Sequence, residues 1–333
     1  MSFPEREELG QAVMKQEKKQ GENILVGTCS WADRTLVGSG WYPRGLSDPS
    51  GRLKFYSGQF RTVEVDSTFY AIPDEATVYN WAARTSPDFR FNIKAFGLFT
   101  FHSVDYGSLP SWLRKEFPLP HGSGRLKFSE IPRSLRMELW RYFEQVIKPL
   151  HQMGRMGYLL FQLPPWAGFS KRMTEYMRRV AEVATPFKVA VEIRNRTWLE
   201  GGNVNEFLDL LREFNLAYVI VDEPDLEWTV PPERFVTASW GSVVRFHGRN
   251  RESWSRTDVP VQERFRYLYS EEELIPWKNS LQEISSQVSL VYAMFNNCFR
   301  NYAVRNASQM QDLLGQKPPS GQVRAIQQDL GLH

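Results

Sequence analysis

Eight short runs of apolar, β-branched and aromatic residues recur along the chain, and several are separated by stretches in which apolar positions have helical spacing. The runs cover residues 24–30, 62–68, 89–95, 158–163, 189–194, 217–222, 242–248 and 289–297. The helical stretches cover residues 74–85, 135–153, 170–184, 203–214, 270–287 and 306–314. The connections after the first and sixth runs carry weak helix signals, so we expect them to be short or irregular.

Strands that alternate with helices pair in parallel, and eight such units suit a closed (β/α)8 barrel of the TIM type. An open doubly wound sheet is the runner-up. It is disfavoured because the sequence Gly27-Thr28-Cys29-Ser30-Trp31 is not a dinucleotide-binding loop. We expect a single α/β domain over residues 23–316, a charged tail over 1–22 and a polar tail over 317–333. A long loop insertion over residues 103–133 would lie on the catalytic face of the barrel.

Polar and apolar side chains alternate along four of the expected strands. In the second strand Val63 and Val65 face one way, and Glu64 and Asp66 face the other. The face that meets the surrounding helices must be apolar, so the polar face should point into the barrel. The same reasoning selects the polar side chains of three further strands, which are Asn92, Lys94, Glu192, Arg194, Arg245 and His247. The corresponding ends of other strands carry Gln162, Asp222, Asn296 and Asn297.

Charged side chains inside a barrel cost free energy unless they are paired. The expected ones lie toward the carboxyl ends of their strands, where barrel enzymes carry out their chemistry. We therefore expect a polar, ligand-binding pocket at that end. The alternative is an ion-paired plug that fills the upper barrel, because the carboxylates nearly balance the charges of Lys94, Arg194 and Arg245.

Composition adds limits on the class of protein. Hydrophobic residues make up 42 % and charged residues 24 % of the 333 residues, which is typical of a globular protein. A net charge of +3 is too small to indicate a nucleic-acid partner by itself. Two cysteines exclude a disulfide framework and favour a reducing compartment. Neither a signal peptide nor a membrane-spanning run is visible, so we expect a cytoplasmic protein with no membrane partner and leave its oligomeric state open.

Several motifs resemble the YecE-like family, also called domain of unknown function 72, over residues 24–314. The motifs are Gly27-Thr28-Cys29-Ser30-Trp31, Trp41-Tyr42-Pro43, Val63-Glu64-Val65-Asp66-Ser67-Thr68-Phe69-Tyr70, Phe161-Gln162-Leu163-Pro164-Pro165, Val191-Glu192-Ile193-Arg194 with Trp198, Val244-Arg245-Phe246-His247-Gly248-Arg249, and Phe295-Asn296-Asn297. The resemblance implies a (β/α)8 barrel and supplies no reaction. The family's pattern more often has Asn at position 66 and Phe and His at 193 and 195, and the insertion looks longer than typical.

General acid/base catalysis, in a hydrolase or a lyase, is the first functional hypothesis. The expected catalytic residues are Glu64, Glu192, His247 and Asp222. The expected substrate-binding residues are Asp66, Tyr70, Lys94, Gln162, Arg194, Trp198, Arg245, Arg249, Asn296 and Asn297. Glu64 and Glu192 would serve as acid and base, and His247 would transfer protons near neutral pH. The cations suit a small anionic substrate that is phosphorylated or nucleotide-like.

Two other functions stay open. A nucleic-acid-binding barrel would use aromatic residues near the upper face for base stacking, beside Arg249, Arg251 and Arg256. These aromatic residues are Trp31, Trp41, Tyr42, Tyr70, Trp166, Trp198 and Trp254. The chain has no zinc-binding motif and requires no cofactor by its sequence. A Mg²⁺- or Mn²⁺-dependent hydrolase could still use Glu64, Asp66, Glu192 or Asp222.

Overall fold

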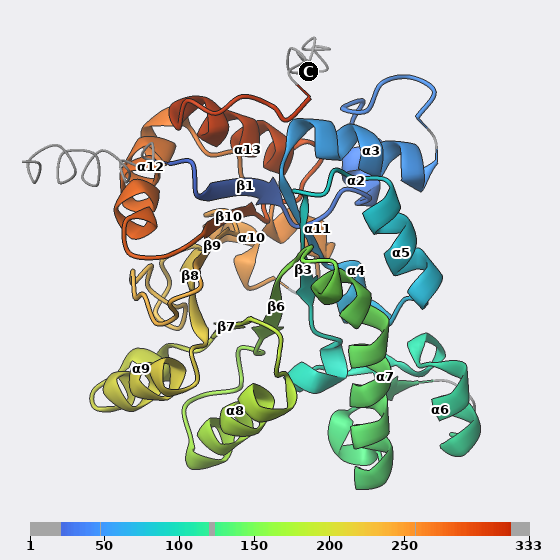
Figure 1. Cartoon of the computed structure of the whole chain (residues 1–333). Helices are drawn as coiled ribbons and strands as arrows, with labels where there is room; N and C mark the ends of the chain where they lie inside the picture. Colours follow the sequence, from blue (N-terminus) through green and yellow to red (C-terminus); the bar gives the residue numbers. More distant parts are fainter. Residues whose placement is uncertain (1–20, 47, 120–123, 257, 321–333) are drawn as a thin grey trace, which may run out of the picture.

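The computed structural model describes residues 21–46, 48–119, 124–256 and 258–320. Its eight parallel strands form a closed barrel in the order β1, β2, β3, β6, β7, β8, β9, β10, and helices surround it (Figure 1). The strands span Ile24–Thr28, Thr62–Val65, Arg90–Lys94, Met156–Gln162, Val189–Glu192, Ala217–Asp222, Ser242–Phe246 and Val291–Phe295. The predicted barrel is confirmed. The predicted tails lie mostly outside the described residues.

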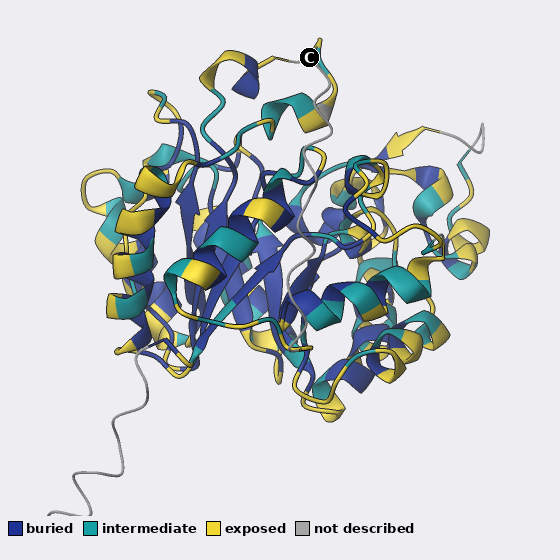
Figure 2. Cartoon of the chain, turned by 90° about the horizontal axis from the view of Figure 1, so that it is seen from above, coloured by how far each residue is buried: buried dark blue, intermediate teal, exposed yellow. Residues whose placement is uncertain are grey.

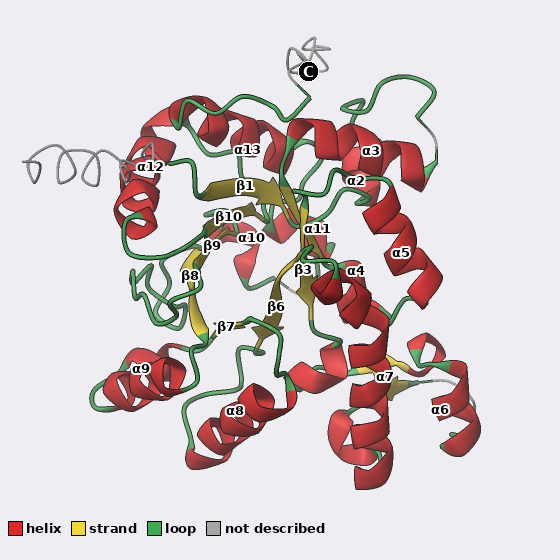
Figure 3. Ribbon diagram, in the orientation of Figure 1, coloured by secondary structure: helices red, strands yellow, loops and turns green. Residues whose placement is uncertain are grey.

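Six longer helices occupy the stretches that the sequence predicted (Figure 3). They are α5 (Glu75–Ala83), α7 (Arg133–Gln152), α8 (Lys171–Val183), α9 (Asn203–Glu213), α12 (Glu271–Ser285) and α13 (Tyr302–Leu313). Shorter elements at the ends of strands are α2 (Arg34–Val37), α4 (Ser67–Tyr70), η1 (Gly97–Thr100), η4 (Arg196–Leu199), α10 (Arg251–Trp254) and α11 (Val261–Arg264). No helix within the described ranges is long and apolar enough to cross a membrane.

The first crossover differs from the expectation, because it contains the eleven-residue helix α3 (Pro49–Gln59). The Asp48 side chain accepts a hydrogen bond from the Gly51 amide at 2.7 Å, and proline occupies the first helical position. An acidic cap followed by proline is a helix-start signal that the sequence did carry. The sixth crossover, over residues 223–241, forms no helix, as expected.

The described parts of the insertion, residues 103–119 and 124–133, form a folded segment rather than an open loop. It contains a two-stranded antiparallel sheet and short helical turns between β3 and α7. These elements are β4 (Val104–Asp105), η2 (Tyr106–Ser108), α6 (Ser111–Glu116), β5 (Arg125–Leu126) and η3 (Phe128–Glu130). The buried Tyr106 hydroxyl of η2 donates to the carbonyls of Arg114 and Phe117 at 3.0 and 3.1 Å, and these bonds hold α6 to η2.

The core lies between the barrel and its helices, where the strands are almost entirely buried (Figure 2). Helix α7 illustrates how it is built, since its buried residues recur with helical spacing at Leu139, Phe143, Val146 and Leu150. Each such side chain contributes about 1.5–3 kcal/mol to folding. This apolar layer outside the strands confirms that the polar faces of the strands point inward.

Candidate functional site

The pairing register decides which side chains enter the barrel, because partners on adjacent parallel strands face the same side. Arg245 pairs with Val221 on one neighbour and Met294 on the other, and Gln162 pairs with Glu192. Contacts and register together place a polar set inside. Its members are Glu64, Asp66, Asn92, Lys94, Tyr158, Gln162, Glu192, Arg194, Glu223, Arg245, His247 and Asn296.

Arg245 forms the centre of this set. One terminal nitrogen of its guanidinium donates to Glu192, and the other donates to Glu64 Oε1 at 2.5 Å. The second nitrogen also lies 3.6 Å from Cys29 Sγ and 3.9 Å from Asp66 Oδ1. Arg245, Glu64 and Glu192 have no solvent exposure. The middle of the barrel is therefore filled by an ion-paired network rather than by an open pocket.

Glu192 accepts hydrogen bonds from four side chains. Its Oε1 receives Gln162 Nε2 at 2.6 Å, His247 Nε2 at 3.0 Å and Arg194 at 3.3 Å, and its Oε2 receives Arg245. Burial by itself would raise the pKa of this carboxyl, but the charges of Arg245 and the other donors lower it well below the usual range. Glu192 thus accepts four donors and has no solvent exposure, which suits a carboxylate that holds its neighbours in place.

Glu64 is the less saturated partner of Arg245. Its second oxygen accepts a hydrogen bond from the buried Tyr158 hydroxyl at 2.9 Å. Burial raises the pKa of Glu64, and the charge of Arg245 offsets only part of that rise. The two carboxyls that share one guanidinium thus have pKa values shifted in opposite directions.

His247 departs from the expectation that it exchanges protons near neutral pH. Its Nε2 faces Glu192, and its Nδ1 lies 2.9 Å from the Asn296 amide nitrogen. Burial lowers the pKa of His247 to about 4, which outweighs the attraction of Glu192. The ring is therefore neutral at pH 7, and it links Asn296 to the central network.

Above the centre lies a layer of polar and charged groups, which we call the barrel mouth and define as Asp66, Lys94, Gln162, Arg194 and Asn296. Asp66, Gln162 and Arg194 are half-buried, and Lys94 and Asn296 are each 8 % exposed. Lys94 Nζ lies 3.5 Å from Asp66 Oδ1, and their side chains are 11 % and 24 % exposed. Arg194, 14 % exposed, lies over the Trp254 ring at 5.4 Å. The side chains of Asp66, Lys94 and Arg194 thus keep partial contact with solvent, unlike the buried network beneath them.

Glu223 belongs to the site, although sequence reasoning missed it. Its carboxylate pairs with Arg194 at 2.9 Å and accepts the Val230 amide at 2.9 Å. Burial raises the pKa of Glu223, while Arg194 opposes the rise. Alternation shows only that one of the adjacent residues Asp222 and Glu223 faces inward, and the apolar sequence of β8 does not indicate which one.

Asp222 and Arg249 are corrections to the expected site. The Asp222 side chain points outward, where it accepts a hydrogen bond from the Trp277 indole of α12. It also pairs with Arg249 through two bonds of 2.7 and 2.6 Å. Its register partner Phe246 likewise faces the helices. This pair joins β8 to the loop after β9 and does not line the barrel mouth.

Asn297 and Trp198 also lie outside the site. The Asn297 amide donates to the Tyr267 carbonyl and to Asn306 of α13, both at 2.8 Å, so it anchors a helix. The Trp198 indole is fully buried and donates to the Ala167 carbonyl at 2.8 Å. Tyr70 is 65 % exposed and follows Phe69, whose ring lies under the Lys94 ammonium at 4.8 Å, so Tyr70 borders the barrel mouth.

Comparison with known proteins fits this geometry. The family model described as "Protein of unknown function DUF72" matches residues 25–328. The chain belongs to the DUF72 family. The UPF0759 protein YunF of Bacillus subtilis (strain 168) is 28 % identical over 295 residues, which cover 87 % of this chain and 94 % of YunF.

Solved DUF72 structures share the barrel. A DUF72 protein from Thermotoga maritima MSB8 is 32 % identical, with a TM-score of 0.69, and the match covers 88 % of this chain and 99 % of that one. A DUF72 protein from Enterococcus faecalis V583, 24 % identical, gives a TM-score of 0.71 with 88 % and 96 % coverage, and shows the fold alone. The names of these relatives state no reaction, so the function of this DUF72 chain must be inferred from its own site.

The aromatic rim expected for a nucleic-acid-binding barrel is largely internal in this DUF72 chain. Trp31, Trp41, Tyr42, Trp198 and Trp254 are buried, whereas Tyr70 and Trp166 are 65 % and 67 % exposed. Two exposed rings make a much smaller stacking surface than the seven that the sequence offered.

The carboxylates expected for Mg²⁺ or Mn²⁺ do not converge. The Arg245 guanidinium lies between Glu64 and Glu192, and Asp222 faces the helices. Among the residues that the structure describes, no three His, Cys, Asp or Glu side chains are placed to hold a metal ion. Glu64, Glu192 and Asp222 instead pair with the protein's own arginine side chains.

Proposed function

We propose that this protein is an enzyme that binds a small anionic substrate, phosphorylated or nucleotide-like, at the barrel mouth and acts on it by acid/base catalysis. The observation that carries the proposal is the partly exposed layer of Asp66, Lys94 and Arg194 above the fully buried network of Arg245. Buried ion pairs rarely add net stability over an apolar core. Barrels normally fill this space with branched apolar side chains, so a charged interior favours a functional explanation.

The exposed cations supply the anion-binding part of the site. Lys94 and Arg194 come from β3 and from the end of β7, and each leaves part of its side chain in contact with solvent. Arginine binds phosphate and carboxylate groups through two parallel hydrogen bonds, and lysine adds a point charge. Gln162 and Asn296 add amide groups for orientation. Glu64, Glu192, Arg245 and His247 act as positioning residues beneath this layer.

Asp66 is the group best placed to exchange a proton with the substrate. Its side chain is 24 % exposed, and its buried Oδ1 lies 3.5 Å from Lys94 and 3.9 Å from Arg245 and accepts no hydrogen bond from the described residues. Unlike Glu192, this carboxylate therefore has free lone pairs. General acid/base groups contribute about 10²- to 10⁴-fold to a rate, and the loss of that contribution is measurable.

Turnover tests this role. Phosphorylated sugars and nucleotides would be incubated with the protein, and their consumption followed by phosphorus NMR. For a consumed compound, we expect Asp66→Asn to lower kcat by about 10²-fold or more while the folded barrel is retained. An unchanged kcat in this variant would remove Asp66 from the chemistry.

Anion binding is tested separately with inorganic phosphate by titration calorimetry. We expect Lys94→Met to weaken phosphate binding about ten-fold, and added salt to weaken it in the unchanged protein. Lys188→Met is the matched control, because Lys188 precedes β7 at the opposite end of the barrel and lies over Trp240. Equal affinities in the two variants would contradict an anion site at Lys94.

A further inference from the structure

A second cavity, of about 1000 Å³, lies between helices α7 and α8 and is separate from the barrel mouth. Helix α7 packs against α5, and α8 packs against α9. The two helices meet where the Trp140 indole donates to the Val183 carbonyl at 3.2 Å. The insertion and η1 cover another side of the cavity. We call this cavity the α7–α8 groove.

Aromatic side chains form the floor of the groove. They are Phe99, Phe101, Phe128, Trp140, Phe161 and Tyr176. The two polar groups among them are already bonded, since the Tyr176 hydroxyl donates to the Phe99 carbonyl and the Trp140 indole donates to Val183. The floor therefore offers no spare donor to a nucleobase or a sugar. It suits a hydrocarbon body, for which burial of apolar surface is the main source of affinity.

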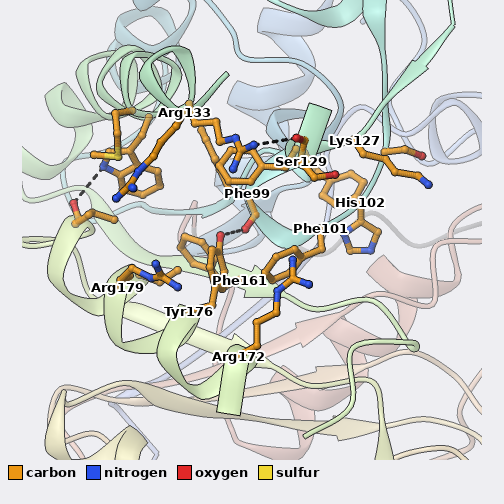
Figure 4. A pocket seen from close by; sticks show the side chains of 18 of the residues that line it. Phe99, Phe101, His102, Lys127, Ser129, Arg133, Phe161, Arg172, Tyr176 and Arg179 are labelled. Atoms are coloured by element: carbon orange, nitrogen blue, oxygen red, sulfur yellow. Dashed lines mark hydrogen bonds between the residues drawn. The ribbon is translucent and has the colours of Figure 1, made fainter. Parts of the chain in front are cut away.

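Cations border this floor on both helices. On α7 they are Arg133 and Arg136, and on α8 Arg172 and Arg179 are seven residues apart and so share one face. Figure 4 shows Phe99 and Phe101 between Arg133 on one side and Arg172 and Arg179 on the other.

These cations are poorly neutralised. The insertion adds Arg125 and Lys127, whereas Glu182 is the one carboxylate among the described lining residues. Arg136 donates to the carbonyls of Ile131 and Ser129. Arg133, Arg172 and Arg179 make no ion pair within the parts of the chain that the structure describes.

We propose that the α7–α8 groove binds an amphipathic anion with a hydrocarbon body, such as a medium-chain fatty acid. The body would lie on the aromatic floor, and the carboxylate would bind the guanidinium groups of Arg133, Arg172 and Arg179. The volume lies at the upper end of the range for ligand pockets, about 300–1000 Å³. This site does not depend on the proposed activity, because none of the five barrel-mouth residues lines the groove and Phe69 lies between Lys94 and the groove.

Dodecanoate below its critical micelle concentration is the probe, titrated by calorimetry into the full chain. We expect saturable binding of one dodecanoate, with dodecyltrimethylammonium at least about ten-fold weaker because its head carries the opposite charge. Arg179→Gln should weaken dodecanoate binding about ten-fold. Arg178→Gln is the matched control on the next residue, which pairs with Glu213 outside the groove.

A second variant tests the cavity itself. Met137 is 43 % exposed and lines the groove, so Met137→Trp should fill space without disturbing the buried core and should abolish dodecanoate binding. Three results would overturn the proposal: no dodecanoate binding, equal affinity for the cationic amphiphile, or equal effects of the Arg178 and Arg179 variants. Displacement of dodecanoate by a short single-stranded oligonucleotide would assign the groove to nucleic acid and would also overturn it.

Discussion

Arg245 determines the chemistry of the barrel interior at the scale of single residues. Its guanidinium donates to both Glu64 and Glu192, and their carboxyls differ in how many donors they accept. Glu192 is saturated and ionised, whereas burial raises the pKa of Glu64. The network therefore combines the two interpretations that the sequence left open. It is an ion-paired plug at its centre, and its upper edge presents charges to solution.

Glu192→Gln tests whether this carboxylate holds the network together. The new amide would turn a donor toward Arg245, Arg194 or His247 and would leave a buried charge unpaired. We expect a loss of about 3–5 kcal/mol in the free energy of unfolding, measured with urea. Glu213→Gln, in an exposed pair with Arg178, should cost less than about 1 kcal/mol. Equal urea midpoints for Glu192→Gln and the unchanged protein would contradict the positioning role.

The low pKa of His247 predicts how stability depends on pH. Burial lowers this pKa from 6.5 to about 4 in the folded state, so the unfolded chain binds more protons between these two values. Stability contributed by neutral His247 is complete above pH 6.5 and falls as the pH decreases toward 4. Between pH 7.5 and 5 the loss should be about 2 kcal/mol.

The unchanged protein and His247→Gln would be compared by urea unfolding across this range. In His247→Gln the free energy of unfolding should decrease less as the pH falls, because the contribution of His247 is absent. Burial and the charge of Lys94 also lower the pKa of His102 to about 4. His102 should therefore contribute a similar part of the pH dependence, which His102→Gln should remove. If neither substitution changes how the free energy of unfolding depends on pH, neither His247 nor His102 is held neutral by the folded protein.

Strand β8 shows what alternation decides at the scale of an element. Asp222 ends this strand and Glu223 follows it. The Glu223 side chain points inward to Arg194, and the Asp222 side chain points outward to Trp277. The sequence placed an acidic side chain at this position of the barrel but selected the wrong one of two neighbours. The outcome depends on which alternate residues of the strand face the barrel interior. A strand whose sequence has no distinct polar and apolar faces does not reveal this.

Paired substitutions on β8 separate the two roles. Glu223→Gln removes a negative charge beside Arg194, so phosphate binding should strengthen about five-fold, equivalent to about 1 kcal/mol of charge attraction. Asp222→Asn should leave phosphate binding unchanged and reduce the free energy of unfolding by about 1–3 kcal/mol. A change in phosphate affinity with Asp222→Asn as large as that with Glu223→Gln would contradict the assignment of faces.

For the whole molecule, the sequence was sufficient to predict the barrel, because period-2 and helical patterns alternate regularly. It also predicted most of the polar interior, including Glu64, Glu192 and Arg245. It could not show that Glu192 accepts four donors, since these side chains come from three different strands or their ends, β6, β7 and β9. Nor could it show that α7 and α8 enclose a cavity, because helical spacing of basic and aromatic residues does not determine how far apart two helices lie.

The most direct test of the central claim is a crystal structure of the protein soaked in tungstate, a tetrahedral anion located by its anomalous scattering. The account predicts a tungsten peak at the barrel mouth, in contact with Lys94 and Arg194, above the undisturbed pairs of Arg245 with Glu64 and Glu192. A peak in the α7–α8 groove alone, or a barrel mouth without tungsten at saturating tungstate, would contradict the claim that the barrel mouth is the anion-binding site.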